Sequence, residues 1–335
     1  MDSATQFILG ASVAGVTLGR TLGPRALLIG GLLGTLPDLD SFIPMGNAID
    51  NMTYHRGFSH SVFVLTALSP VIAAVLSRTI DGLKGRFGLA LLSVWLCLVT
   101  HPILDSLTTY GTQIFWPLGN SPPGMAPVAF PSVFIIDPVY TLIMLTGVLV
   151  FWRKRERGYR VLAGTLAAGT VYLAIGAVGH LSVKARAESH PAFQGKSLHV
   201  QPSPFNIIGW QILGVDDQEF VVALTGITPS CDVVPVVRGP RIAAPPNAAD
   251  LSSSVKRLEW FSHGFFTYRI NGNNLVLSDM RMGFSPRFVF SFEVAEKSGN
   301  GFTGIVPKRS VADTPRAPAV GRLLVRVFDT LKSCI

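Results

Sequence analysis

The sequence predicts an α-helical polytopic membrane domain with about four to six membrane segments, followed by a β-rich extramembrane domain. Hydrophobic residues make up 48% of the 335 positions and charged residues only 14%, whereas charged residues average about a quarter in soluble proteins. The apolar runs lie in the first half, which holds 8 of the 20 acidic residues. We therefore expect a helical membrane domain at 1–184 and a soluble outer domain at 185–335.

Six apolar segments are candidates to cross a membrane. A helix rises about 1.5 Å per residue and must cross about 30 Å of hydrocarbon, so a span needs about 20 residues. The first two segments are short and predict a hairpin that need not span fully, whereas the last three are long enough. The third needs flanking residues to span. In chain order they are residues 7–19, 25–36, 61–77, 87–104, 133–152 and 161–181.

Positive charges predict how this bundle is oriented. Basic residues crowd the loops at 153–160 and 78–86, and such loops stay in the cytoplasm. Alternation of the spans then places the polar motifs described below, and the whole second half, on the opposite side. We expect a multi-pass protein of a bacterial-type inner membrane, with its site and its C-terminal domain on the periplasmic side.

The second half predicts a β-rich domain. Short runs of β-branched and aromatic residues are typical of strands, and Asn271-Gly272 between two of them is typical of a hairpin. The runs are residues 221–227, 265–270, 274–278 and 287–295.

The charge pattern also limits the partners. Basic residues form no run outside the loop at 153–160, so no nucleic-acid partner is expected. No sequence motif indicates an obligate protein partner. Cys231 and Cys334 lie far apart in the sequence, which leaves their pairing open.

The first chemical motif is His101-x-x-x-Asp105, at the end of an apolar run. Ionisable side chains inside a membrane segment are costly and mark functional sites. This spacing places both side chains on one helix face, where they can supply two metal ligands. Pro102 predicts a helix break near Thr100 or His101. Alternatively, His101 bonds a backbone carbonyl near a kink and Asp105 caps the next segment.

The second motif, HRGFSHS, contains His55, Arg56 and His60 just before a membrane segment. Ser59 or His60 would lie near the positive end of the following helix, which favours an anion. Alternatively, a serine of the motif caps that helix and the histidines are interfacial. That interpretation explains a serine better than it explains two histidines and an arginine.

The third motif, Pro37-Asp38-Leu39-Asp40, ends the second apolar segment. In an extended chain Asp38 and Asp40 point to one side and offer two carboxylates to one centre, whereas in a turn one of them only ends the helix. Carboxylates together with imidazoles suit zinc, manganese or iron better than copper and do not distinguish among the three.

Asp137-Pro138 has two interpretations. An aspartate at the N-cap with a proline at the first helical position is a standard helix start. Asp137 could also be a hydrogen-bond partner that orients a ligating histidine.

Absent motifs narrow the chemistry. The sequence contains neither HExxH nor GxSxG, and the histidine clusters of membrane desaturases are missing. Histidine, aspartate and a nearby arginine instead suit metal-activated water attacking a phosphoester, with Arg56 holding the developing charge.

With these motifs in view, the chain resembles the YdjM family of membrane proteins, regarded as metal-dependent hydrolases, over nearly its whole length. That family is distantly similar to zinc-dependent phospholipases C and P1-type nucleases, which implies phosphoester hydrolysis, in particular of a lipid headgroup. The matching stretches are MDSATQFILGA (1–11), GTLPDLD (34–40), YHRGFSHS (54–61), HPILDSLTTYGTQIFWP (101–117), FIIDPVYT (134–141), PSPFNIIGW (202–210), WFSHGF (260–265) and DMRMG (279–283).

The resemblance also implies roles for single residues. Many members carry histidine where this chain has Gln6, and an amide is a poor zinc ligand, so Gln6 is expected to hold water or substrate. Asp279 and Arg281 would reach the site from the outer domain or form a structural ion pair. The implied metal or catalytic positions are Asp38, Asp40, His55, His60, His101 and Asp105.

We therefore predict a membrane-embedded hydrolase that cleaves a phosphoester of a membrane lipid with a divalent metal, zinc being expected and manganese or iron the alternatives. The lipid substrate is inferred from the position of the site at the membrane surface. The predicted metal ligands are Asp40, His60, His101 and Asp105; the catalytic residues are Asp38, His55 and Arg56; and Gln6, Asp137, Asp279 and Arg281 are supporting or substrate-binding residues.

Two other functions remain open. A transporter or assembly protein could use the buried histidines and aspartates to bind metal or protons, although the apolar inner ends of the segments argue against a continuous path. A metal-free lipid phosphatase could work through a phosphohistidine. Such an enzyme needs several lysines and arginines to bind the phosphate, and Arg56 is the only one next to the candidate histidines in the sequence motifs.

Overall fold

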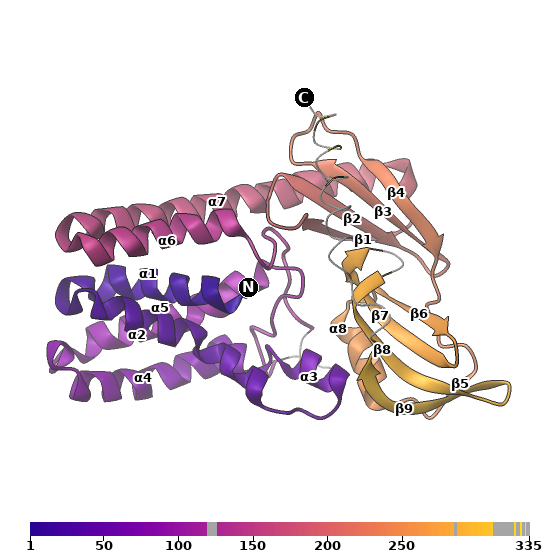
Figure 1. The fold of residues 1–335 in the computed structure, drawn as a ribbon, viewed down its shortest axis with the longest axis horizontal. Helices are drawn as coiled ribbons and strands as arrows, with labels where there is room; N and C mark the ends of the chain where they lie inside the picture. Colours follow the sequence, from indigo (N-terminus) through magenta and orange to yellow (C-terminus); the bar gives the residue numbers. More distant parts are fainter. Residues whose placement is uncertain (119–125, 285–286, 311–324, 326–328, 330–331, 333–335) are drawn as a thin grey trace. The chain divides into compact units, whose positions relative to one another are not determined.

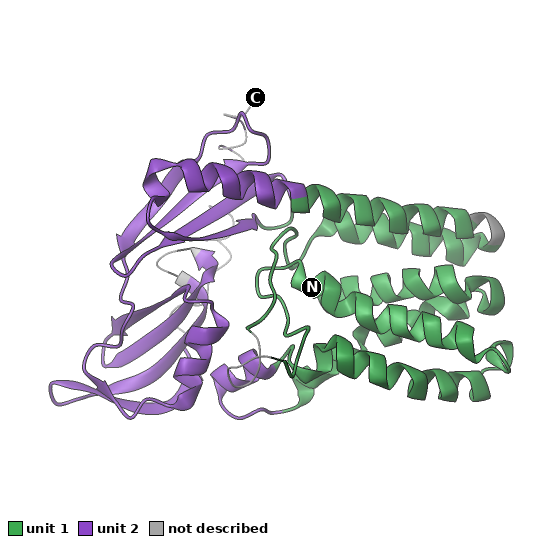
Figure 2. Ribbon diagram, turned by 180° about the vertical axis from the view of Figure 1, so that it is seen from behind, with its two compact units in different colours: residues 1–43, 55–177, 204–206 green, residues 44–54, 178–203, 207–335 purple. Residues whose placement is uncertain are grey.

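The computed structural model describes residues 1–118, 126–284 and 287–310, together with residues 325, 329 and 332. The chain divides into two compact units (Figure 2). The boundary expected near residue 184 falls within a long helix that both units share. Unit 1 comprises residues 1–43, 55–177 and 204–206, and unit 2 comprises residues 44–54, 178–203 and 207–335.

Unit 1 is a bundle of apolar helices (Figure 1). The predicted first hairpin is present as α1 and α2, and α1 also packs against α5 and α6. The helices of the bundle are α1 (Ser3–Leu22), α2 (Arg25–Thr35), α4 (Val62–Thr79), α5 (Phe87–Ser106), α6 (Pro138–Arg153) and α7 (Arg155–Ser189), and the short 3-10 helices are η1 (Leu36–Phe42), η2 (Phe58–His60) and η3 (Asp81–Leu83).

Three of the described helices are long and apolar enough to cross a membrane, namely α4, α5 and the Gly158–Ser189 part of α7. The predicted segment at 133–152 is shorter than expected, because its helix begins only at Pro138 and its 16 residues extend about 24 Å. Conversely, α4 reaches 18 residues without borrowing Phe58. Val71 of α4 is 60% exposed, which suits a surface in contact with lipid.

Glycines bring α1 and α2 into close contact. A Cβ atom at Gly30 would lie 2.2 Å from the Gly10 carbonyl oxygen and 2.3 Å from Ala14 Cβ. Likewise, a Cβ atom at Gly34 would lie 2.6 Å from the Gln6 carbonyl oxygen. Small residues allow the backbones of membrane helices to approach this closely. Close packing matters there because helices in lipid attract one another mainly through packing and not through the hydrophobic effect. The close approach holds Gly34 beside the start of α1.

Replacing Gly30 with alanine should lower the thermal stability of the detergent-solubilised protein, because overpacking costs about 1–3 kcal/mol. Gly164→Ala in α7 is the matched control, since a Cβ atom there meets nothing within 4 Å. It should leave the unfolding midpoint unchanged or slightly raise it, because glycine costs a helix about 1 kcal/mol. Equal midpoints for the two variants, measured by tryptophan fluorescence, would contradict the close helix contact.

Unit 2 contains two β-sheets, one with strand order β1-β2-β3-β4 and one with order β5-β9-β8-β7-β6. Neighbouring strands are antiparallel except for β5 and β9. The predicted hairpin is confirmed, because Asn271 pairs with Asn274 across Gly272, whose φ is 59°. The strands are β1 (Ser197–Pro202), β2 (Gly209–Val215), β3 (Glu219–Gly226), β4 (Val234–Pro240), β5 (Ala248–Ala249), β6 (Phe266–Asn271), β7 (Asn274–Phe284), β8 (Arg287–Ser298) and β9 (Gly301–Arg309), and the helices are α3 (Ala48–Tyr54), η4 (Pro191–Phe193) and α8 (Ser253–Phe261).

The first sheet of unit 2 is covered on both faces, so every residue of β2 is buried. Ile212 packs toward Val183 in the last part of α7, whereas Leu213 packs toward Met280 of the second sheet. Successive strand residues point to opposite faces, which explains why the neighbours Ile212 and Leu213 are both buried. The predicted fold class, a helical membrane domain followed by a β-rich domain, is thereby confirmed. Cys231 is disulfide-bonded, and Cys334 lies outside the described residues.

Candidate metal centre

Four side chains of unit 1 converge at one end of the helical bundle. Asp38 comes from η1, His60 from η2, and His101 and Asp105 from the last turns of α5. One donor atom of each lies within 4.8 Å of the other three, and only Asp38 is partly exposed. Such a cluster of imidazoles and carboxylates is a candidate site for one metal ion.

The helix break predicted at Pro102 does not occur. Helix α5 continues through Pro102 to Ser106, so that His101 and Asp105 share one face, as their spacing predicted. Proline removes a single backbone hydrogen bond, and neighbouring helices can compensate for this loss inside a membrane bundle.

Five of the six separations between the donor atoms lie near those of a tetrahedral site, and the sixth, between Asp38 and Asp105, is at most 4.8 Å. His60 Nε2 lies 3.1 Å from His101 Nε2 and 3.5 Å from Asp38 Oδ1. Asp105 Oδ2 lies 3.6 Å from His60 Nε2 and 3.8 Å from His101 Nε2. Zinc bonds of about 2.0–2.1 Å place tetrahedral ligands about 3.3–3.4 Å apart. The spacing of the four atoms is therefore compatible with one divalent cation, which this cluster could hold.

Hydrogen bonds on the far side of each imidazole aim both Nε2 atoms at the cluster. His101 Nδ1 lies 2.6 Å from the Gly34 carbonyl oxygen, which can only accept, so Nδ1 carries the proton. His60 Nδ1 lies 2.9 Å from Ser59 Oγ, and Ser59 in turn donates to Asp40. Each imidazole thus presents the lone pair of its Nε2 to the centre, in the arrangement that orients metal-ligating histidines.

Electrostatics favour the protonation states that a metal requires. Burial lowers the pKa of His60 to about 4, against the opposing effect of the Asp38 carboxylate. Burial alone raises the pKa of Asp38, but its contacts with the His101 and His60 imidazoles outweigh this effect and hold the pKa below its usual range. At neutral pH the imidazole is therefore neutral and the carboxylate ionised, as metal binding requires.

Asp40 lies outside this group of four and supports it. Its Oδ1 lies 2.7 Å from His55 Nδ1, and its Oδ2 accepts from Ser59 Oγ and from the Arg56 backbone at 3.3 Å. The segment containing both aspartates is a 3-10 helix and not an extended chain. Residues two apart in a 3-10 helix point about 120° away from each other, so Asp38 joins the cluster and Asp40 does not.

Arg56 is a buried cation beside the cluster. Its Nε lies 3.3 Å from Asp105 Oδ2, and its Nη1 donates to the Gly111 carbonyl oxygen at 3.4 Å. Its φ of 68° is a strained backbone conformation for a residue with a side chain. Gln113 N and Thr112 Oγ1 both donate to the Arg56 carbonyl oxygen and hold the strained residue in place. The loop therefore fixes the guanidinium at Asp105.

Gln6 approaches the same carboxylate from α1. Its Nε2 donates to Asp105 Oδ1 at 2.9 Å and to the His101 carbonyl oxygen at 3.2 Å. Its Oε1 is buried and has no hydrogen-bond partner among the described residues. An unpaired buried acceptor costs about 1–3 kcal/mol. This oxygen is therefore free to accept a hydrogen bond from water or substrate. The amino group of Met1 also contacts Asp105.

The other three predicted residues lie outside the cluster. Asp137 caps α6 by accepting from Tyr140 N at 3.0 Å, and it also accepts from the Tyr172 hydroxyl at 2.8 Å. In unit 2, Arg281 donates from Nε to Oδ1 and from Nη2 to Oδ2 of Asp279 and forms a buried ion pair with it. From the sequence, Ser59 was expected near the N-terminus of the following helix, beside an anion or as its cap, and its position between Asp40 and His60 was not foreseen. The only feature of the sequence that could have indicated this role is that Ser59 directly precedes the candidate ligand His60.

Residues 1–183 match the family described as YdjM inner membrane protein, a range that contains every residue of the cluster. The chain belongs to the YdjM family. This YdjM-family chain is thus an inner membrane protein with a buried histidine and aspartate cluster that could bind a metal ion.

Two curated relatives resemble parts of this YdjM-family chain. YfhP of Bacillus subtilis (strain 168), described as uncharacterized, is 26% identical over 170 residues, which cover 49% of this chain and 50% of YfhP. The inner membrane protein YbcI of Escherichia coli (strain K12) is 34% identical over 108 residues, which cover 30% of this chain and 58% of YbcI. The chain thus spans between half and three fifths of the length of these relatives. No solved structure matches it.

Proposed function

We propose that this protein is a membrane-embedded, metal-dependent hydrolase of phosphoesters. The observation that carries the proposal is the convergence of four metal-ligating atoms next to a buried arginine. Asp38, His60, His101 and Asp105 would hold the metal. When bound, a divalent cation would supply an acidified water and polarise a phosphoryl oxygen.

The donor set fits zinc, with manganese or iron as alternatives. Two imidazoles and two carboxylates are common ligands of all three metals, and the spacing of the donors suits zinc–ligand bonds. Asp105 Oδ2 is buried and accepts no hydrogen bond from the described residues, although Arg56 Nε lies 3.3 Å away, so it could act as a ligand atom. Zinc can also expand to five ligands, which leaves room for substrate.

The surrounding side chains supply the other parts of a hydrolytic site. Arg56 brings a guanidinium that can bind the phosphoryl oxygens and stabilise their developing charge. Gln6 offers a free amide oxygen that can orient the attacking water. His55, whose side chain is 28% exposed and bonded to Asp40, would protonate the leaving oxygen. Each role corresponds to a residue that the sequence had already marked.

The rim of the site supports a membrane lipid as the substrate. Leu39 and Phe42, on the same short helix as the two aspartates, are 52% and 81% exposed, and Phe58 is 43% exposed beside His60. Exposed apolar side chains of this kind mark surfaces that contact membranes or partners. A lipid could place its headgroup at the metal while its acyl chains remain against these residues.

The test is phosphoester hydrolysis by the detergent-purified chain, with mixed micelles of phosphatidylglycerol or phosphatidylethanolamine and a soluble nitrophenyl phosphodiester as substrates. We expect release of a water-soluble phosphate from lipid, lost on chelation and restored by zinc or manganese. Metal-loaded protein that cleaves none of these esters would overturn the hydrolase proposal and favour a non-enzymatic role. Cleavage of the soluble ester alone would overturn the lipid substrate.

A further inference from the structure

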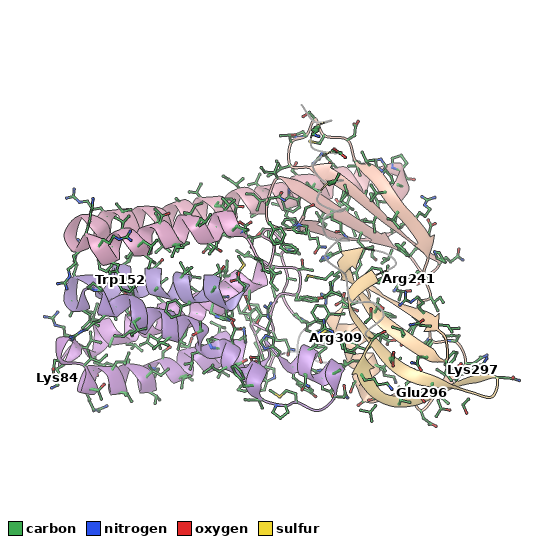
Figure 3. The ribbon with its side chains drawn as sticks, in the orientation of Figure 1. Lys84, Trp152, Arg241, Glu296, Lys297 and Arg309 are labelled. Atoms are coloured by element: carbon green, nitrogen blue, oxygen red, sulfur yellow. The ribbon has the colours of Figure 1, made fainter. Side chains whose placement is uncertain are left out.

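A second concave site lies at the opposite end of unit 1 from the metal centre. It is a pocket of about 850 Å³ between the ends of α1, α6 and α7. Gln6 and Arg20 are about four turns apart on α1, so the two sites are separated by roughly 20 Å. Figure 3 shows Trp152 and Lys84 at this end of the bundle. The lining includes Arg20, Leu22, Phe151, Arg155, Tyr159 and Arg160.

Three guanidinium groups give this pocket a concentrated positive charge. Its described lining contains Arg20, Arg155 and Arg160 but no acidic residue. Arg20 packs over the Tyr159 ring at 4.6 Å, and the Tyr159 hydroxyl donates to the Val16 carbonyl oxygen at 3.0 Å, so these two side chains are held in place. Guanidinium groups bind phosphate oxygens in pairs, which makes an organic phosphate the fitting anion.

The apolar surroundings of the pocket favour a phosphate that carries acyl chains. Phe151 forms a buried wall of the pocket, and Leu22 lies beside it. On the adjoining surfaces of α6 and α7, Leu149, Trp152 and Val161 are exposed, Trp152 by 66%. Tryptophan and tyrosine concentrate at the level of lipid headgroups. A phospholipid would use both the arginines and this apolar surface, whereas free phosphate would use only the arginines.

We propose that this pocket binds the headgroup phosphate of an anionic phospholipid through Arg20, Arg155 and Arg160. Basic pockets between membrane helices recognise anionic headgroups in this way. A lipid held here joins the ends of α1, α6 and α7, so it stabilises the folded bundle to an extent that rises with the logarithm of the lipid concentration above its Kd. The proposal does not depend on the chemistry of the metal centre.

The test is native mass spectrometry of the full chain in detergent, with phosphatidylglycerol or zwitterionic phosphatidylcholine added in equal amounts. The pocket variant combines Arg20→Gln, Arg155→Gln and Arg160→Gln. The matched control combines Arg25→Gln, Arg153→Gln and Lys154→Gln, which removes the same charge from neighbouring positions outside the pocket lining. We expect wild type and control to retain phosphatidylglycerol in preference to phosphatidylcholine. The pocket variant should retain at least about tenfold less phosphatidylglycerol, because a tenfold change in affinity requires the loss of only 1.4 kcal/mol of binding free energy.

Three outcomes would overturn the proposal. Equal loss of phosphatidylglycerol by both variants would show that diffuse positive charge, and not the pocket, attracts the lipid. Equal retention of both lipids by wild type would remove the headgroup preference. Displacement of the lipid by millimolar inorganic phosphate would identify a site for a free anion. If the triple variant does not fold, the single Arg160→Gln substitution, compared with Arg153→Gln, gives the same comparison.

Discussion

Replacing His101 with alanine is expected to abolish stoichiometric metal binding by the purified protein. Its Nε2 lies 3.1 Å from His60 Nε2 and 3.4 Å from Asp38 Oδ1, at the centre of the donor set. Loss of a partner that merely orients a ligand costs about 10–100-fold in metal affinity, so loss of a ligand should cost more. Elemental analysis of detergent-purified protein measures the effect, and Asp105→Ala should behave in the same way.

His55→Ala is the matched control for this prediction. His55 belongs to the same sequence motif as His60, but it bonds Asp40 and lies outside the group of four donors. Its variant should therefore keep the metal. A wild-type protein without stoichiometric transition metal, or a His101→Ala variant that retains it fully, would refute the metal centre. Loss of metal from His55→Ala alone would place the ligands around Asp40 instead.

Replacing Arg56 with glutamine should lower kcat for phosphoester hydrolysis by about 100-fold or more while the metal is retained. The guanidinium is buried beside Asp105, and removal of one group that stabilises transition-state charge costs about 100- to 1,000-fold. Arg56→Lys should fall between glutamine and wild type, because lysine keeps the charge but loses the planar pair of donors. The measurement is steady-state kinetics on the metal-loaded variants.

Arg25→Gln serves as the control for Arg56, because Arg25 is an exposed arginine at the start of α2. Its variant should keep the wild-type kcat. If Arg56→Gln hydrolysed phosphoesters at the wild-type rate with full metal content, Arg56 would have only a structural role in the strained loop. A loss of metal from Arg56→Gln would instead assign it to holding Asp105 in place.

Local sequence signals predicted much of the fold. Asp137-Pro138 marked the start of α6 by capping chemistry, and Asn271-Gly272 marked a hairpin because glycine tolerates a positive φ. The full extent of the predicted segment at 133–152 was not correct, because apolar residues before Asp137 lie in a non-helical connection. Hydrophobicity alone cannot distinguish an apolar connection from a helix.

The sequence by itself marked His60, His101 and Asp105 as candidate ligands, with Asp40 where the described cluster has Asp38. Ionisable side chains in apolar segments are too costly to be retained by chance, so His101 and Asp105 stood out without a structure. Only the tertiary structure decided how the aspartates divide their roles. The 3-10 geometry of η1 turns Asp38 toward the histidines and Asp40 toward His55, and the glycine contact of α2 with α1 brings the Gly34 carbonyl to His101. Such directions depend on backbone rotation and on contacts between distant segments, which sequence spacing does not contain.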